Sequence, residues 1–378
     1  MLVLSRPFHC PTRIHSASSF DTAVAGLLAD RKWLFLTSAG WKQRGAIEAL
    51  TAAVGQPVAI IDSVPANPRI SDIEKLSAGI PNADVVVALG GGSVIDTAKG
   101  IVALTALGND LKLLIAHLKD GLELPNAFAP IPIIAVPTTS GTGSEVTRWG
   151  TIWGDENVKF SLHNPTLFPS DAVIDPALCT SMPPDVTLSS GLDALSHAME
   201  AVWNQNNTPL SDHFASVAIM SLRENLDQVM VDPENVEIRR RLQMAALFAG
   251  YAMGTTQTAL AHSISYPFTA HFGMPHGFAC SFTLPEVARY NSAVHPERLA
   301  PIAAGLSCAI SEIPSALESW FDELNLGHYL AGYVSPDVTD QFGDSLITPA
   351  RAANNLRDVN GRTAQILARR SLERFCPN

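Results

Sequence analysis

The segment Asp84–Gly100, DVVVALGGGSVIDTAKG, decides the fold class of this chain. An apolar run leads into three glycines and a serine, and a helix-like pattern follows. Continuous rather than alternating apolar character is typical of a strand that is buried on both faces of a parallel sheet. The segment therefore predicts a strand, a glycine-rich turn and a helix, which is the repeating unit of an α/β sheet.

Three more apolar runs in the first half of the chain have the same character. They are Lys32–Thr37, Pro57–Ile61 and Ile131–Val136. Helical patterns such as Trp41–Val54 and Ser93–Leu104 lie between them. Strands that alternate with helices predict βαβ units and therefore an open parallel sheet.

The second half of the chain has a different pattern. After about Asp175 the strand signals end, and Ala/Leu-rich segments follow in Val186–Trp203, Pro209–Met230 and Glu237–Ala259. The stretch from residue 175 to 184 holds three prolines and no periodicity, which is typical of a boundary. We therefore expect an α/β domain over residues 1–178 and an all-helical domain over residues 179–378.

Composition and charge narrow the function classes. The chain has 378 residues, of which 47% are hydrophobic and 16% charged, and this suffices for two buried cores. The formal net charge of −11 has no compensating basic block, so nucleic acid is not an expected partner. The longest apolar stretches, such as Pro130–Pro137 and Ala245–Met253, are too short to span a membrane. The first residues, MLVLSRPFHC, do not resemble a signal peptide.

The five cysteines are widely spaced, at Cys10, Cys179, Cys280, Cys308 and Cys376. No CxxC pair occurs among them. This spacing suggests neither a disulfide framework nor a thiolate metal cage. A reducing cytoplasm is the expected location.

Two loops have the composition of phosphate-binding turns. Gly90–Ser93 lies between a strand and a helix, where backbone N–H groups and the helix dipole favour an anion. Pro137–Glu145, PTTSGTGSE, follows the next predicted strand and is rich in hydroxyls and glycines. Each loop alone also fits a tight turn without a ligand, and neither is the GxGxxG fingerprint. Two such loops at the carboxyl ends of strands favour a nucleotide or dinucleotide in one crevice.

A carboxylate and an imidazole share one helix face in Gly191–Glu200, GLDALSHAME. Asp193 and His197 are four residues apart, so both can reach one ligand. An Asp/His pair at this spacing is also common as a surface pairing. The apolar neighbours favour metal binding, because unpaired polar groups are costly in such a setting.

Two further histidines, His262 and His276, lie in AHSISYPFTAHFGMPHG. Prolines and a glycine between them prevent one straight helix, so we expect the two to come from different elements. One carboxylate and three imidazoles suit Fe²⁺ or Zn²⁺ with a position left open for substrate.

Four motifs together resemble those of the iron-containing alcohol dehydrogenases. They are GGGSVIDTAK, PTTSGTGSEVT, GLDALSHAME and the PHG of His276 downstream of His262, in the family's order over nearly the whole chain. The resemblance implies a dinucleotide-binding α/β domain, then a helical metal-binding domain, with the ion in the cleft between them. The implied ligands are Asp193, His197, His262 and His276. The implied activity interconverts an aldehyde and an alcohol with NADH or NADPH, and the family is usually dimeric.

The same resemblance implies which residues contact the cofactor. The candidates are Ser38, Gly91, Gly92, Ser93, Asp96, Thr138, Thr139, Thr142, Ser144 and Lys159. Many members carry an Asp near Ser38, which would repel the 2′-phosphate of NADP. Serine would not, so the sequence permits NADPH as well as NADH.

One departure from the family concerns proton transfer. The family usually has a histidine four residues after His262, and this chain has Tyr266 there. The product proton would then come through water, a ribose hydroxyl, Tyr266 or His271.

A narrower resemblance is to the phosphonoacetaldehyde reductase branch, carried by SEVTRWGTIW and the Tyr266 segment. A phosphonate dianion needs a cationic pocket, for which arginine is best shaped. Arg148 follows the second loop and is the favoured anion ligand, although it could instead pair with Asp155 or Glu156. Lys159 could simply be solvated. The substrate candidates are Arg148, Trp149, Lys159, His163 and Met253.

Other functions are compatible with this plan. The substrate could be another small, uncharged aldehyde. A lyase of the dehydroquinate synthase type shares the two-domain plan and a bound NAD, but the helical half has no dense basic cluster for a phosphate. A regulator that binds metal or nucleotide would show no turnover with any aldehyde.

Overall fold

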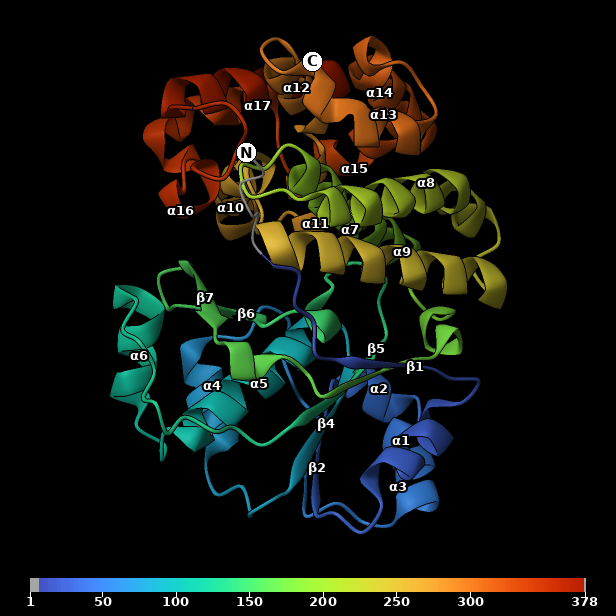
Figure 1. Cartoon of the computed structure of the whole chain (residues 1–378), viewed down its shortest axis with the longest axis vertical. Helices are drawn as coiled ribbons and strands as arrows, with labels where there is room; N and C mark the ends of the chain where they lie inside the picture. Colours follow the sequence, from blue (N-terminus) through green and yellow to red (C-terminus); the bar gives the residue numbers. More distant parts are fainter. Residues whose placement is uncertain (1–6, 377–378) are drawn as a thin grey trace. The chain divides into compact units, whose positions relative to one another are not determined.

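The computed structural model describes residues 7–376, which divide into two compact units (Figure 1). One unit comprises Cys10–Thr139 and Gly143–Thr180. The other comprises Ser140–Thr142 and the described residues of Met1–His9 and Ser181–Asn378.

The first unit is built on a six-stranded parallel sheet. Its strand order is β1-β8-β5-β4-β2-β3. The strands are β1 (Arg13–Ser16), β2 (Trp33–Thr37), β3 (Ala59–Ile61), β4 (Val85–Gly90), β5 (Ile133–Pro137) and β8 (Asp171–Ile174). The predicted α/β class with a parallel sheet is therefore confirmed.

Helices cover both faces of this sheet, which explains the continuous apolar runs. Alternate residues of β4 enter two separate cores: Val85 and Val87 contribute to one, Val86 and Ala88 to the other. The first core also holds residues of α1 (Phe20–Leu28) and α3 (Ala46–Val54). The second holds residues of α4 (Ile70–Ser77), α5 (Gly92–Ala106) and α6 (Leu111–Asp120). A strand buried on both sides needs no polar face.

Some elements differ from the sequence prediction. The edge strand β1, the short strand β8 and the antiparallel pair β6 (Trp149–Trp153) and β7 (Lys159–His163) were not predicted. The helix expected over Trp41–Val54 is two helices, α2 (Ala39–Gln43) and α3, separated at Gly45. Gly45 has a φ of +77°, a left-handed conformation that cannot continue a helix.

The second unit is built from helices, as predicted, and its described part has no strand beyond an isolated bridge between Asn204 and Asn355. Its three long helices and α10 surround one large apolar core with the shorter helices that follow. The helices are α7 (Pro184–Val202), α8 (Pro209–Val231), α9 (Val236–Thr256), α10 (Leu260–Phe272), α11 (His276–Ser281), α12 (Leu284–Ser292), α13 (Ala300–Leu306), α14 (Ile313–Glu323), α15 (Leu326–Ala331), α16 (Pro349–Ala352) and α17 (Gly361–Phe375).

Within the described residues, no individual helix combines the length and apolar character needed to cross a membrane. By length and composition alone, Pro296–Leu306 and Ile310–Glu323 would qualify only as a pair, and the two are bent by 81°.

Candidate functional site

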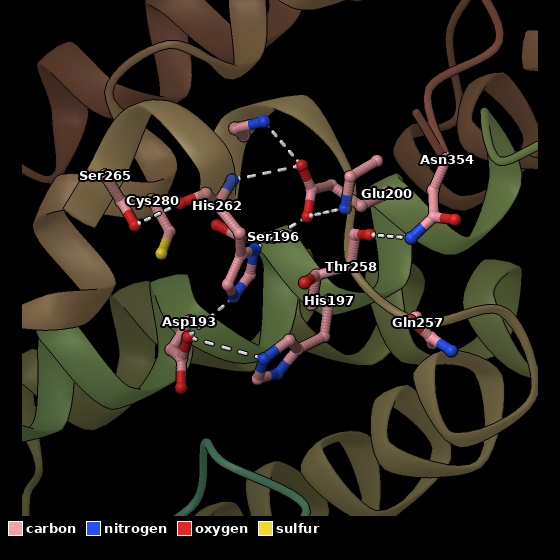
Figure 2. A network of polar contacts seen from close by, with 12 residues as sticks. Asp193, Ser196, His197, Glu200, Gln257, Thr258, His262, Ser265, Cys280 and Asn354 are labelled. Carbon is pink, nitrogen blue, oxygen red and sulfur yellow. Dashed lines mark hydrogen bonds and ion pairs between the residues drawn. The ribbon is translucent and has the colours of Figure 1, made fainter. Parts of the chain in front are cut away.

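Helix α7 carries a row of buried polar side chains (Figure 2). Asp193 and His197 are 4% and 6% exposed, and Asp193 Oδ1 lies 3.6 Å from His197 Nε2. The spacing of four residues places both on one face of the helix. The apolar residues between them pack into the core of the helical unit.

His262 and His276 reach the same place from two other helices. His262 lies in α10, and His276 is the first residue of α11. The break between them falls at Gly273, with a φ of +65°, whereas Pro267 lies inside α10. His262 Nε2 is 3.8 Å from Asp193 Oδ1, and the ring centroids of His262 and His276 are 5.3 Å apart.

The fourth predicted ligand, His197, also lies beside His262. The two imidazole rings are stacked, with centroids 4.8 Å apart and an interplanar angle of 20°. The structure thus brings together Asp193, His197, His262 and His276 from α7, α10 and α11.

This arrangement fits a cation. Asp193 Oδ1 and His262 Nε2 are buried, and neither has a hydrogen-bond partner in the described part of the chain. Leaving such groups unpaired in the interior is costly, and a metal ion between them would satisfy both. Carboxylate and imidazole donors suit Fe²⁺ or Zn²⁺ better than Mg²⁺ or Ca²⁺.

One donor in this cluster was not expected from the sequence. Cys280 Sγ lies 3.6 Å from both ring nitrogens of His276. Donor atoms of Asp193, His262, His276 and Cys280 all lie within 4.8 Å of one another. The absence of a CxxC pair argued against a metal site made of several cysteines, but the fold places the single thiol of Cys280 beside the histidines. The available signal was the spacing of four residues from His276 to Cys280.

A second residue that the sequence reasoning missed is Glu200, which is fully buried in α7. Its carboxylate accepts hydrogen bonds from the backbone N–H groups of Ala259 (2.8 Å), Ala261 (2.5 Å) and His262 (3.2 Å). It also contacts Nδ1 of His262 at 2.6 Å. The contact fixes the ring so that Nε2 points toward Asp193, as Figure 2 shows. A carboxylate behind a ligand histidine is a common orienting device in metal sites.

Glu200 and His262 each stabilise the charged form of the other. Burial would raise the pKa of Glu200, but His262 and the backbone donors outweigh burial and hold that pKa below its usual value. Burial would lower the pKa of His262, but the charges of Cys280 and Glu200 raise it well above its usual value. Both shifts follow from the buried contact between the two side chains.

Glu200→Gln is expected to weaken Zn²⁺ binding by about 10- to 100-fold. The amide keeps the size of the side chain but places an NH₂ group where a carboxylate oxygen of Glu200 now accepts hydrogen bonds. Competition with a chromophoric chelator measures the affinity. Ser196→Ala is the matched control, because that buried hydroxyl donates a hydrogen bond to the Leu192 carbonyl of its own helix. Equal affinities for Glu200→Gln and the control would contradict the orienting role.

Glycine 277 allows α11 to approach α7. A Cβ atom at this position would lie 1.7 Å from the backbone carbonyl oxygen of Ser189 in α7. Contact at that distance is impossible, so any larger residue would displace α11. The close approach positions His276 and Cys280, which flank Gly277 on the same short helix.

The two candidate proton donors are placed differently. The ring of Tyr266 is stacked near His276, with centroids 6.4 Å apart. His271 is exposed, and its ring lies near Phe342. Nine residues of α-helix turn through about 900°, so His271 lies on the opposite face of α10 from His262. The structure brings Tyr266, but not His271, to the cluster.

In the α/β unit, the candidate cofactor residues gather at the carboxyl ends of three adjacent parallel strands. Ser38 follows β2, the glycine turn follows β4, and Thr138 and Thr139 follow β5. A Cβ atom on Gly91 would lie 3.2 Å from the Thr139 side chain, so the two loops are closely packed. Trp41, which the sequence reasoning missed, donates from Nε1 to Thr138 Oγ1 at 3.0 Å. Crevices at such strand ends are the usual nucleotide sites of α/β sheets.

Behind these loops lies a buried polar group that shapes the second loop. Lys99 Nζ donates to the backbone carbonyls of Ser144 (2.7 Å) and Thr147 (2.9 Å) and to Ser144 Oγ (2.9 Å). Asp96 accepts from Ser144 Oγ and from the N–H of Thr151. Burial lowers the pKa of Lys99 to about 8 and raises that of Asp96. Asp96 and Ser144 are thus tied to each other and to the loop. Thr142 is grouped with the helical unit.

Four of the five candidate substrate residues lie at the β6–β7 hairpin. Arg148 directly precedes β6, and its guanidinium lies over the Trp149 ring, 5.3 Å from the centroid. Trp149 in turn stacks on His163, with ring centroids 4.8 Å apart. Lys159 begins β7, on the strand that pairs with β6. Met253 lies in α9 of the helical unit.

The Arg148 guanidinium has unused hydrogen-bonding capacity. Its Nε atom is buried and has no hydrogen-bond partner among residues 7–376. No ion pair with Asp155 or Glu156 occurs among the same residues, so the structural alternative considered for this arginine is not realised. A buried donor without an acceptor is costly, which favours a ligand that accepts a hydrogen bond at this position.

Two family models match the chain: iron-containing alcohol dehydrogenase over residues 11–176, and the C-terminal part of the Fe-containing alcohol dehydrogenase family over residues 187–364. A 1,3-propanediol dehydrogenase of Klebsiella pneumoniae is 34% identical over 285 residues, covering 73% of this chain and 72% of that protein. A phosphonoacetaldehyde reductase of Streptomyces viridochromogenes is 39% identical over 214 residues, covering 56% and 54%. The structure of a sulfoacetaldehyde reductase of Bifidobacterium kashiwanohense in complex with NAD⁺ has the same fold, with a TM-score of 0.84, 24% identity and coverage of 97% and 98%.

Proposed function

Because the chain belongs to the iron-containing alcohol dehydrogenase family, we propose that it reduces a small anionic aldehyde, phosphonoacetaldehyde, to the corresponding alcohol. The single observation that carries the anionic substrate is Arg148, whose buried Nε has no acceptor among the described residues. The phosphonoacetaldehyde reductase relative supports the same substrate. Reduction of an uncharged aldehyde is the alternative that the same fold accommodates.

We propose Asp193, His197, His262 and His276 as the residues that hold the ion, Fe²⁺ or Zn²⁺. When bound, the ion polarises the aldehyde carbonyl and stabilises the charge that develops on its oxygen. Glu200 orients His262 through Nδ1 and leaves Nε2 directed at the ion position. Tyr266, beside His276, is the better placed of the two candidate proton donors.

We propose that the loops after β2, β4 and β5 bind a nicotinamide dinucleotide, which supplies the hydride. The backbone N–H groups at the start of α5 would hold the pyrophosphate, because a helix N-terminus after a glycine turn favours an anion. Ser38 adds no negative charge at the adenosine ribose, so it would not repel the 2′-phosphate of NADPH, and both NADH and NADPH are candidate cofactors.

The experiment that tests this proposal is a spectrophotometric panel of aldehydes. Phosphonoacetaldehyde and neutral aldehydes of similar size are compared, with NADH or NADPH and with Fe²⁺ or Zn²⁺ added back. One NAD(P)H oxidised per aldehyde consumed supports a reductase, and no net oxidation would indicate a lyase of the dehydroquinate synthase type. Preference for a neutral aldehyde over phosphonoacetaldehyde would contradict the anionic substrate.

Arg148→Ala is expected to raise KM for phosphonoacetaldehyde by about 10- to 100-fold, because hydrogen bonds to charged groups contribute about 1.5–3 kcal/mol. KM for propanal should change by less than about twofold, since a neutral aldehyde offers no anion to the guanidinium. Steady-state kinetics with both aldehydes checks the difference. Arg44→Ala, which removes an exposed arginine of the same unit, is the control. An equal rise for both aldehydes would remove the anion-binding role.

We also propose a homodimer in the cytoplasm. Light scattering of the purified protein tests the first, and cell fractionation tests the second.

A further inference from the structure

We propose that the thiolate of Cys280 is a ligand of the ion held by this site, so that sulfur joins carboxylate and imidazole in the coordination sphere. The inference rests on the metal site of the proposed function. It adds a donor that the chain's four expected ligands do not include.

The sulfur of Cys280 belongs to the group of side-chain atoms that could hold one metal ion. Cys280 Sγ lies 3.6 Å from the ring nitrogens of His276, and donor atoms of Asp193 and His262 fall within 4.8 Å of it.

The fold holds this sulfur in place. Cys280 is fully buried, and it lies one turn after His276 on α11. The contact of Gly277 with Ser189 presses the same helix against α7. Figure 2 shows the Cys280 side chain next to His262, above Asp193. The buried oxygen of Asp193 and the buried nitrogen of His262, both without hydrogen-bond partners among the described residues, point into the same space.

The other described cysteines have different surroundings. Cys10 Sγ contacts the Val146 carbonyl at 3.5 Å, and Cys376 Sγ contacts the Gly327 carbonyl at 3.7 Å. Within residues 7–376, Cys280 is the cysteine that belongs to the group of possible metal donors. This difference provides internal controls.

A sulfur ligand has chemical consequences. The thiol must lose its proton to solvent when the bond to the metal forms, so binding releases a proton. Thiolate is a soft donor, which shifts the preference of the site toward Zn²⁺ and Co²⁺ relative to a purely nitrogen and oxygen site.

Cobalt substitution of the full-length protein tests the proposal directly. Co²⁺ bound to a thiolate absorbs in the near ultraviolet through sulfur-to-metal charge transfer, whereas Co²⁺ bound only by nitrogen and oxygen does not. We expect this band in the wild-type protein, its complete loss in Cys280→Ser and Cys280→Ala, and its retention in Cys308→Ser. X-ray absorption of the Zn²⁺ form should show a sulfur shell at about 2.3 Å, which the Cys280 variants lack.

Each outcome decides the point. No charge-transfer band in the Co²⁺-loaded wild type, or a band that survives in Cys280→Ser, overturns the sulfur ligand without reference to any variant's activity. The proposed function has its own readout in the aldehyde panel. Aldehyde reduction without the charge-transfer band would support the proposed function and contradict the Cys280 ligand. The band without aldehyde reduction would support the Cys280 ligand and contradict the proposed function.

Discussion

Replacing His276 with alanine is expected to abolish metal retention and aldehyde reduction together. His276 begins α11 and faces His262 across the proposed ion position, with ring centroids 5.3 Å apart. Alanine removes one donor and leaves the others with no ion to bridge them. Lewis-acid stabilisation by a metal ion contributes several kcal/mol, and each 1.36 kcal/mol is a factor of ten in rate. We therefore expect kcat/KM to fall by about 1,000-fold or more.

Metal content and turnover are measured on the same preparations after dialysis. His328→Ala is the matched control, because that histidine is exposed on α15 of the same helical unit. The control should retain one equivalent of metal and full activity. A metal-free His276→Ala preparation with wild-type activity would refute the metal-dependent mechanism.

Gly277→Ala is expected to destabilise the helical unit by about 3 kcal/mol and to weaken metal binding at the same time. The added methyl group would lie 1.7 Å from the Ser189 carbonyl oxygen, which belongs to the backbone of α7 and cannot rotate away. Relief requires α11 to move. The displacement carries His276 and Cys280 away from Asp193, although neither side chain is altered.

Urea unfolding and Co²⁺ titration check the two effects. Gly332→Ala is the matched control in the same unit, since its Cβ atom would meet only the Tyr329 carbonyl at an ordinary distance of 3.5 Å. The control should change the free energy of unfolding by less than about 0.5 kcal/mol. Wild-type stability and cobalt affinity in Gly277→Ala would mean that α11 tolerates a wider separation than its packing indicates.

The sheet could be predicted wherever a strand is buried on both faces. The runs around β2, β4 and β5 are continuous and apolar, and β2 and β4 are each followed by a helix, so their pattern was sufficient. The strands β1 and β8 could not be found in this way. Each has four residues, and β8 begins with Asp171, a buried carboxylate that is paired with Arg13 and His15 of β1. Pairing between distant residues of opposite charge leaves no periodic signal along the chain.

The candidate site shows the same division. Asp193, His197, His262 and His276 could be selected because their residue types and motif spacing point to a metal. Glu200 was hidden in the same motif, because its role depends on His262 and on backbone groups more than fifty residues away. Cys280 was set aside because cysteine was examined for CxxC pairs, whereas the donor set here mixes sulfur with nitrogen.

All the proposed metal donors come from α7, α10 and α11, within one of the two compact units. The loops that we propose to bind the dinucleotide follow strands of the other unit, apart from Ser140–Thr142, which are grouped with the helical unit. Ion capture and nucleotide capture therefore draw on separate stretches of polypeptide. A substitution that removes metal binding should leave the affinity for the dinucleotide largely intact, so the metal-free protein can still bind the cofactor. Loss of the metal and loss of the dinucleotide would then inactivate the enzyme independently of each other.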